Sequence, residues 1–128
     1  MSKPANPSDL GAAPFGDYVR AARERRRHDD RAFSVRQVAR RINVEPAYLS
    51  KIERGQAPPP SERTIRRLAT ELGEDADVLL AMAGKVSRDL QDIVLRRPRL
   101  FADLLRQLRE APDHAVLRVA REIRDGDW

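Results

Sequence analysis

The sequence contains no cysteine among its 128 residues, which excludes disulfide bonds and thiolate zinc sites. The same absence is typical of a reducing compartment, so we expect a cytoplasmic protein. No apolar run approaches the roughly 18 residues needed to span a bilayer, so we expect no membrane association. The polar stretch at residues 1–13 lacks the apolar segment of a signal peptide, and we expect a disordered arm there.

Aromatic residues are few, at 5% of the chain, so Leu, Ala, Val and Ile must build the core. Histidine is also scarce, with two residues in the chain. His28 and His114 lie far apart, and no carboxylate cluster has the spacing of metal ligands. No Ser-His-Asp order, nucleotide-binding glycine motif or carboxylate pair stands out. We therefore expect no enzymatic activity, no metal and no cofactor.

Charge is abundant, at 35% of the residues, and the positive excess lies on one side of the chain. Residues 1–72 hold 15 Lys and Arg against 9 Asp and Glu, whereas residues 73–128 hold 10 against 11. A one-sided basic excess is the electrostatic footprint of a protein that binds a polyanion. A solvated arginine-rich surface is the competing explanation, so charge alone favours a nucleic-acid partner only slightly.

The apolar residues recur with helical spacing almost throughout, and no segment alternates with a period of two. This pattern predicts an all-α fold, with five helices in residues 14–84 and a helical extension in residues 85–128. The first five helices are expected at residues 15–27, 34–42, 45–54, 62–72 and 76–83. Their ends carry suitable capping or breaking residues, namely Ser34, Pro46, Gly55, Ser61 and Gly73.

The segment from Ser34 to Gly55 predicts two short helices joined by a tight turn. A small residue, a turn residue and three apolar anchors follow one another at offsets 0, 4, 5, 10 and 13, and these are Ala39, Asn43, Val44, Leu49 and Ile52. Such a pattern holds two helices near a right angle. The outer face of the second helix is then free to enter a DNA major groove about 12 Å wide.

The stretch FSVRQVARRINVEPAYLSKIERGQAPPPSERTIRRLATELG resembles the XRE family of Cro/CI-type repressors, above all in its segment LSKIERG. The resemblance covers about residues 15–84. It implies a five-helix Cro/CI-repressor-like helix-turn-helix domain at residues 14–84. The function it implies is that of a small bacterial or phage transcription regulator, which we expect to be a repressor that reads DNA as a homodimer.

The resemblance also assigns DNA-contacting positions. Residues that face base edges in the family correspond to Pro46, Ala47 and Lys51, with Glu45, Tyr48 and Ser50 at the margin. Where the family often has Gln directly after the cap of the first of these two helices, this chain has Val35, and Arg36 is expected to replace that glutamine. The full set of expected phosphate contacts is Ser34, Arg36, Gln37, Arg54 and Arg63.

Glu53 is assigned a structural role by the same resemblance. Family members pair this acid with an arginine of the first helix, for which Arg23 is the candidate. A glutamate facing DNA would repel phosphate, which favours the same interpretation. We therefore expect Glu53 to tie the recognition helix to its scaffold.

The extension at residues 85–128 carries amphipathic stripes that cannot remain exposed on a lone helix. We expect them to dimerise, because readers of the major groove usually bind two half-sites as two-fold dimers, here on a palindromic operator in double-stranded DNA. Two alternatives stay open: the extension caps its own monomer, or it binds a partner protein as in an antitoxin or anti-activator. The expected dimerisation residues are Val94, Leu100, Phe101, Leu104, Leu105, Leu108, Val116, Val119 and Ile123.

Overall fold

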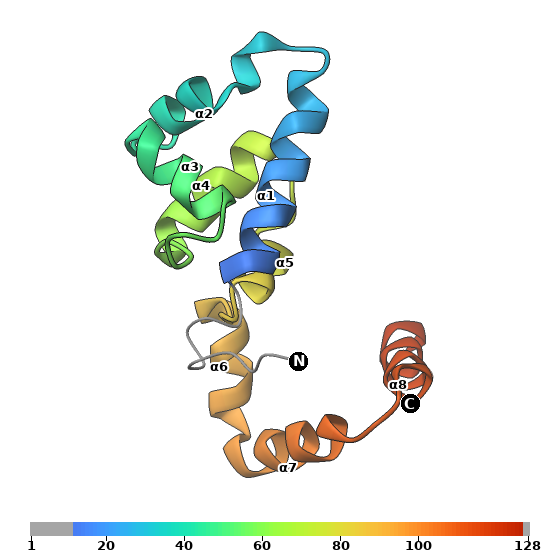
Figure 1. The fold of residues 1–128 in the computed structure, drawn as a ribbon. Coiled ribbons are helices and arrows are strands. Elements are labelled where there is room, and N and C mark those ends of the chain that lie inside the picture. Colours follow the sequence, from blue (N-terminus) through green and yellow to red (C-terminus); the bar gives the residue numbers. More distant parts are fainter. Residues whose placement is uncertain (1–11, 127–128) are drawn as a thin grey trace, which may run out of the picture. The chain divides into compact units, whose positions relative to one another are not determined.

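The computed structural model describes residues 12–126, and this part of the chain consists of eight α-helices and one short 3-10 helix, without a strand (Figure 1). The all-α fold predicted from the apolar periodicity is therefore confirmed. In chain order the elements are α1 (Ala12–Arg27), η2 (Arg31–Phe33), α2 (Val35–Arg41), α3 (Pro46–Glu53), α4 (Glu62–Leu72), α5 (Ala76–Met82), α6 (Arg88–Arg96), α7 (Pro98–Arg109) and α8 (Asp113–Asp125). No helix within residues 12–126 is long and apolar enough to cross a membrane.

The chain divides into two compact units between Ser87 and Arg88, whereas the sequence places the boundary after Gly84. Residues 1–11 of the expected disordered arm lie outside the described residues. Its last two residues, Ala12 and Ala13, belong to α1.

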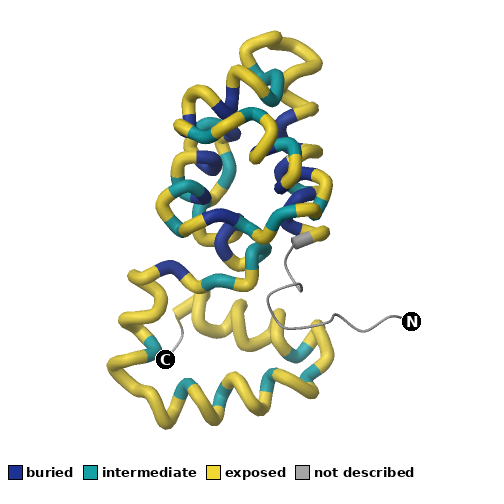
Figure 2. Tube along the Cα trace, turned by 60° about the vertical axis from the view of Figure 1, so that its left-hand side comes forward, coloured by how far each residue is buried: buried dark blue, intermediate teal, exposed yellow. Residues whose placement is uncertain are grey.

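The first unit encloses a single apolar core. Helix α1 contacts α3, α4 and α5, while α2 contacts α3 and α4. The buried positions concentrate in these five helices (Figure 2). Val44, expected to be a buried anchor, is only half-buried and packs against the edge of this core. The core residues are Phe15, Val19, Ala22, Val38, Ala39, Ile42, Leu49, Ile52, Ile65, Leu68, Ala69, Leu72, Leu79 and Leu80.

Local signals set the helix ends of the first unit. The Ser34 hydroxyl accepts a hydrogen bond of 3.2 Å from the Gln37 amide, and that of Ser61 accepts one of 3.3 Å from Thr64. These bonds satisfy helix amides that have no partner within their own helix. At the other end of α4, Gly73 has a φ of 68°, where glycine is free of the strain that a side chain adds.

Gly16 permits a close crossing of α1 over α3. A Cβ atom at this buried position would meet the carbonyl oxygen of Ile52 and lie 2.8 Å from that of Glu53. Both obstacles are backbone atoms, which cannot swing aside. The sequence contains no local sign of this contact, because it depends on a helix more than 30 residues away.

The link between α1 and α2, expected to be a plain loop, contains the short helix η2. The Asp30 carboxylate caps it by accepting a hydrogen bond of 2.9 Å from the Ala32 amide. Phe33 then lies under two guanidinium groups, with Arg26 at 5.4 Å and Arg41 at 5.1 Å from the ring centroid. Cation–π contacts of this kind hold the link against both neighbouring helices.

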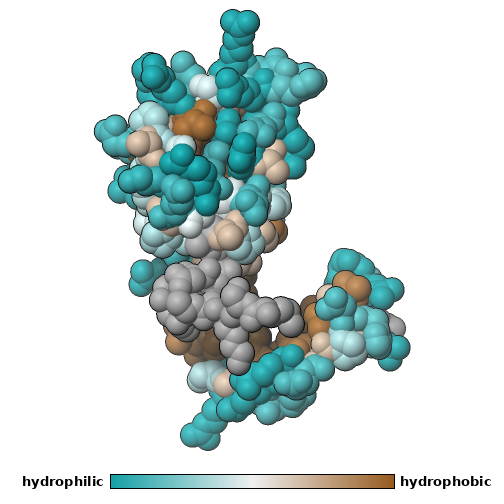
Figure 3. Space-filling view, in the orientation of Figure 1, coloured by the Kyte–Doolittle hydropathy of each residue, from teal (hydrophilic) through white to brown (hydrophobic). Residues whose placement is uncertain are grey.

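The second unit consists of α6, α7 and α8, and none of these helices contains a buried residue. Helices α6 and α7 pack against each other. Hydrophobic side chains gather on the visible surface of this unit, whereas most of the visible surface of the first unit is hydrophilic (Figure 3). Pro112 occupies the cap position of α8, and Asp113 is the first residue of the helix.

Candidate nucleic-acid interface

Helices α2 and α3 pack against each other through a tight turn. Asn43 adopts a φ of 62°, and the Val44 amide donates a hydrogen bond of 2.9 Å back to the Ala39 carbonyl. Asparagine tolerates this left-handed conformation better than most residues with a side chain. Ala39 is fully buried beside the turn. The spacing of small residue, turn residue and anchors in the sequence thus corresponds to a real helix–turn–helix pair.

Helix α3 has a buried face and an open face. Leu49, Ile52 and Glu53 are buried, and successive residues are rotated by about 100° around the axis. Ala47, Lys51 and Arg54 therefore occupy the opposite, exposed face. Of the six residues predicted to read bases, the structure places Ala47 and Lys51 at the centre of this face.

The other four predicted base-reading residues lie beside that face. Pro46 and Ser50 are half-buried on the flank toward α2. Tyr48 lies on the opposite flank with 37% of its surface exposed. Glu45 precedes the helix at its cap position, and its side chain makes no capping hydrogen bond.

A buried ion pair fixes the orientation of α3. Arg23 of α1 donates two hydrogen bonds to the Glu53 carboxylate, from Nε to Oε2 at 2.7 Å and from Nη2 to Oε1 at 2.8 Å. Its Nη1 donates a third, of 3.1 Å, to the Phe33 carbonyl. The hydrogen bonds to Glu53 raise the pKa of Arg23, although burial acts in the opposite direction. The bidentate geometry holds α3 at one rotation relative to α1.

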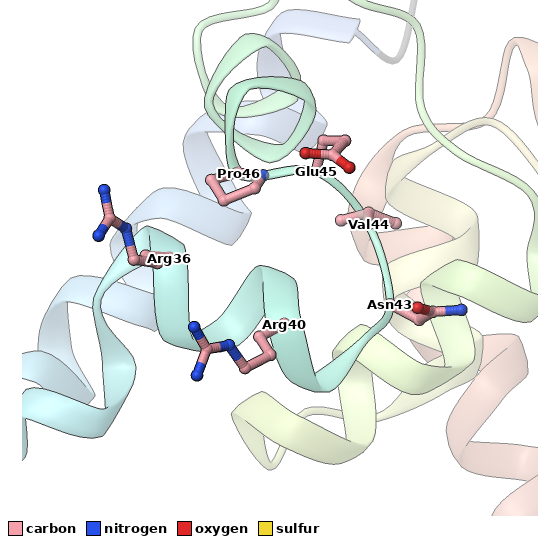
Figure 4. Close-up of a pocket in the computed structure, with 6 residues that line it drawn as sticks. All are labelled: Arg36, Arg40, Asn43, Val44, Glu45 and Pro46. Atoms are coloured by element: carbon pink, nitrogen blue, oxygen red, sulfur yellow. The ribbon is translucent and has the colours of Figure 1, made fainter.

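A hollow beside the turn brings two arginines of α2 next to the start of α3 (Figure 4). Arg36 and Arg40 extend from the same side of α2, because they are four residues apart, and Pro46 lies across from them. Of this pair, the sequence assigns only Arg36 a specific contact with DNA. The spacing of four residues is the signal that would have added Arg40 to it.

The predicted phosphate contacts fall into separate groups. Ser34 caps α2 and Arg36 lies in the hollow beside the turn, while Gln37 is exposed on the side of α2 away from the core. Arg54 lines a second hollow together with Ser50 and Val35. Arg63 is exposed in the first turn of α4, outside the helix–turn–helix pair.

The exposed arginines of this unit differ in whether an acid neutralises them. Arg20, Arg25, Arg41 and Arg66 each form an ion pair with a glutamate. Four other cations, on α2 and α3 and at the end of α3, have side chains that make no hydrogen bond or ion pair within residues 12–126. These unneutralised residues are Arg36, Arg40, Lys51 and Arg54, and Arg26, Arg27, Arg31, Arg63 and Arg67 elsewhere in the described part of the unit also form no ion pair with an acid.

Arg41 thus differs from its neighbour Arg40. The Arg41 guanidinium lies 2.6 Å from Glu71 of α4 and over the Phe33 ring, whereas Arg40 has no acidic partner within residues 12–126. Unneutralised positive charge therefore remains on α2 and on the exposed face of α3, where it is available to a polyanion.

Comparison with known proteins gives one match. A family model described as a helix-turn-helix domain matches residues 14–82, which include α1 to α5 apart from the first two residues of α1. No curated protein and no solved structure matches the chain.

Proposed function

The chain belongs to the helix-turn-helix domain family, and from this premise we propose that it is a sequence-specific transcription regulator of the XRE type. In this proposal α3 enters the major groove of double-stranded DNA. The observation that carries the proposal is the set of unneutralised cations around the exposed face of α3. Such side chains bind the phosphate backbone, while the face between them is free to contact bases.

The contacts divide into two kinds. Arg36, Arg40 and Arg54 surround the α3 face and are suited to phosphates, which position the protein without reading sequence. Lys51 lies at the centre of the face, where its ammonium group donates to guanine O6 or N7. Ser34, Gln37 and Arg63 complete the proposed phosphate contacts.

We further propose that the second unit makes the protein a homodimer, which acts as a repressor on a palindromic operator. Its apolar stripes are not buried within their own unit, and a unit of about 40 residues rarely supplies a sufficient core alone. Residues 88–128 hold 9 Arg against 8 Asp and Glu, so two copies repel each other little. A dimer that occupies an operator blocks access to it, which is the simplest route to repression.

The exposed stripes also favour a second candidate function, in which they hold a different protein, as in an antitoxin or anti-activator. Sedimentation of the purified full chain separates the two. A dimer over the micromolar range supports the homodimer, and a monomer throughout this range excludes it and leaves a partner protein or a cap on its own monomer.

DNA selection tests the main proposal. The full chain is incubated with random duplexes at low and moderate salt, and the bound sequences are determined. We expect a two-fold symmetric motif, with half-sites about 34 Å apart, that persists at moderate salt. Recovery of DNA without a shared motif, with binding that falls as the salt concentration rises, would mean that the basic unit binds phosphate without reading sequence.

Two variants and a matched control assign the contacts. Lys51→Ala should lose about 1–3 kcal/mol of discrimination at one base pair. Arg54→Ala should weaken all sequences alike and reduce the salt slope by about 1. Arg25→Ala removes the same charge from an arginine that is paired with Glu74, and it should change neither quantity strongly. Unchanged specificity in Lys51→Ala would show that another face reads the bases.

A further inference from the structure

The open face of α3 changes its chemistry along the helix. Ala47, in the first turn, presents only a methyl group, and Pro46 beside it has no N–H and an apolar ring. At the centre of this face, side chains that form hydrogen bonds appear only in the later turns, as Lys51 and Arg54, whereas Glu45 at the cap position and Ser50 on the flank lie beside it. The hydroxyl-bearing Tyr48 is on the flank away from α2 rather than at the centre of the face.

This distribution restricts what the first turn can recognise. The N-terminal residues of a recognition helix are the ones that contact base edges. An amino group of adenine or cytosine pressed against Ala47 would lose hydrogen bonds to water, and the Ala47 methyl group offers none in return. Thymine alone presents a methyl group in the major groove, and contact between two apolar groups has no such cost.

We propose that the first turn of α3 reads the 5-methyl group of a thymine through the methyl group of Ala47. A guanine bound by Lys51 lies about two base pairs away, since four helical residues rise about 6 Å and one base-pair step is about 3.4 Å. This inference rests on the proposed function, because it assumes that α3 lies in the major groove. It adds the identity of one base and the atom by which that base is recognised.

Replacement of thymine by deoxyuridine tests the inference, because the substitution removes only the methyl group. In the duplex selected by the full chain, each thymine of the half-site is replaced in turn and the dissociation constant is measured. One position, about two base pairs from a required guanine, should weaken binding about fourfold, the effect of one buried methyl group.

Two protein variants test whether the first turn of α3 contacts the thymine that the deoxyuridine replacement identifies. In Ala47→Gly the thymine and deoxyuridine duplexes should bind equally well, because the protein methyl group is gone. In Lys51→Ala the fourfold preference for thymine should remain while the requirement for guanine is lost. Circular dichroism of both variants should match that of the parent chain.

The outcomes separate the inference from the proposed function. A selected duplex in which no deoxyuridine position weakens binding overturns the inference and leaves the proposed function standing. A thymine preference that persists in Ala47→Gly also overturns it, since another residue would then contact the methyl group. Failure to select any sequence overturns the proposed function, and the inference with it.

Discussion

The two units of this chain are built from the same kind of amphipathic helix and differ in what covers the apolar faces. In the first unit five helices enclose a core of fully buried side chains, held by a buried ion pair and by capped helix ends. In the second unit three helices leave every residue at least partly exposed. An amphipathic pattern therefore indicates that the apolar face of a helix has to be buried. Whether other helices of the chain or a partner molecule bury it is decided by the fold.

The largest expected effect comes from disrupting the proposed dimer interface of the second unit. Leu105→Asp places a charge in the exposed stripe of α7, where a Leu buried in a dimer stabilises it by about 1.5–3 kcal/mol per copy. The dimer dissociation constant should rise about a hundredfold or more, and the second unit should lose helical structure on dilution. Sedimentation equilibrium and circular dichroism across a dilution series measure both.

Ala102→Asp is the control for that substitution, because it adds the same charge on α7 outside the stripe. It should leave association unchanged. A parent chain that stays monomeric and fully helical at every concentration would show that the second unit needs no cover, and the contrast between the two units would disappear.

In the first unit, Glu53→Ala should cost about 3–5 kcal/mol of unfolding free energy, because it leaves Arg23 charged and buried without its partner. Glu71→Ala breaks a pair of similar length that is about 30% exposed, and it should cost less than about 1 kcal/mol. Chemical denaturation of the first unit compares the two variants. Equal losses would mean that the Arg23–Glu53 pair contributes no more than a surface pair.

A smaller change in unfolding stability should distinguish a glycine in a tightly packed helix crossing from a glycine on an open surface. Gly16→Ala should destabilise the first unit by about 1–3 kcal/mol, despite the helix preference for alanine, because the added methyl group meets the backbone of α3. Gly126→Ala, at the end of α8, has a φ of 67° and no neighbour within 4 Å. It should leave the unfolding transition of the first unit unchanged. Stabilisation by Gly16→Ala would contradict the close crossing of α1 over α3.

The sequence predicts this fold best where one residue determines a local conformation. Ser34 and Ser61 mark the starts of helices, and Asn43 marks the turn, because caps and left-handed turns depend on few neighbours. Resemblance to a family supplies the pairing of Arg23 with Glu53, which the structure shows as a bidentate ion pair.

Features that depend on distant elements are the ones the sequence does not reveal. Gly16 is required because carbonyl groups of α3 leave no room for a side chain. The charge of Arg41 is neutralised by Glu71, which is thirty residues along the chain. The apolar stripes after residue 88 are visible in the sequence, but their periodicity contains no information about the surface that covers them. The spacing of four residues indicates that Arg40 shares a side of α2 with Arg36, but the hollow that both line with Pro46 is visible only once α2 and α3 are placed together.

The buried pair of Arg23 and Glu53 affects which positions of α3 can vary during evolution. It anchors α3 from the inner side, so the outer positions Ala47, Lys51 and Arg54 contribute little to holding the helix in place. Under the proposed function, mutation at these positions alters the preferred DNA sequence while the domain keeps its stability. A duplicated copy of a regulator built in this way could then acquire new target genes through a few substitutions on the proposed reading face.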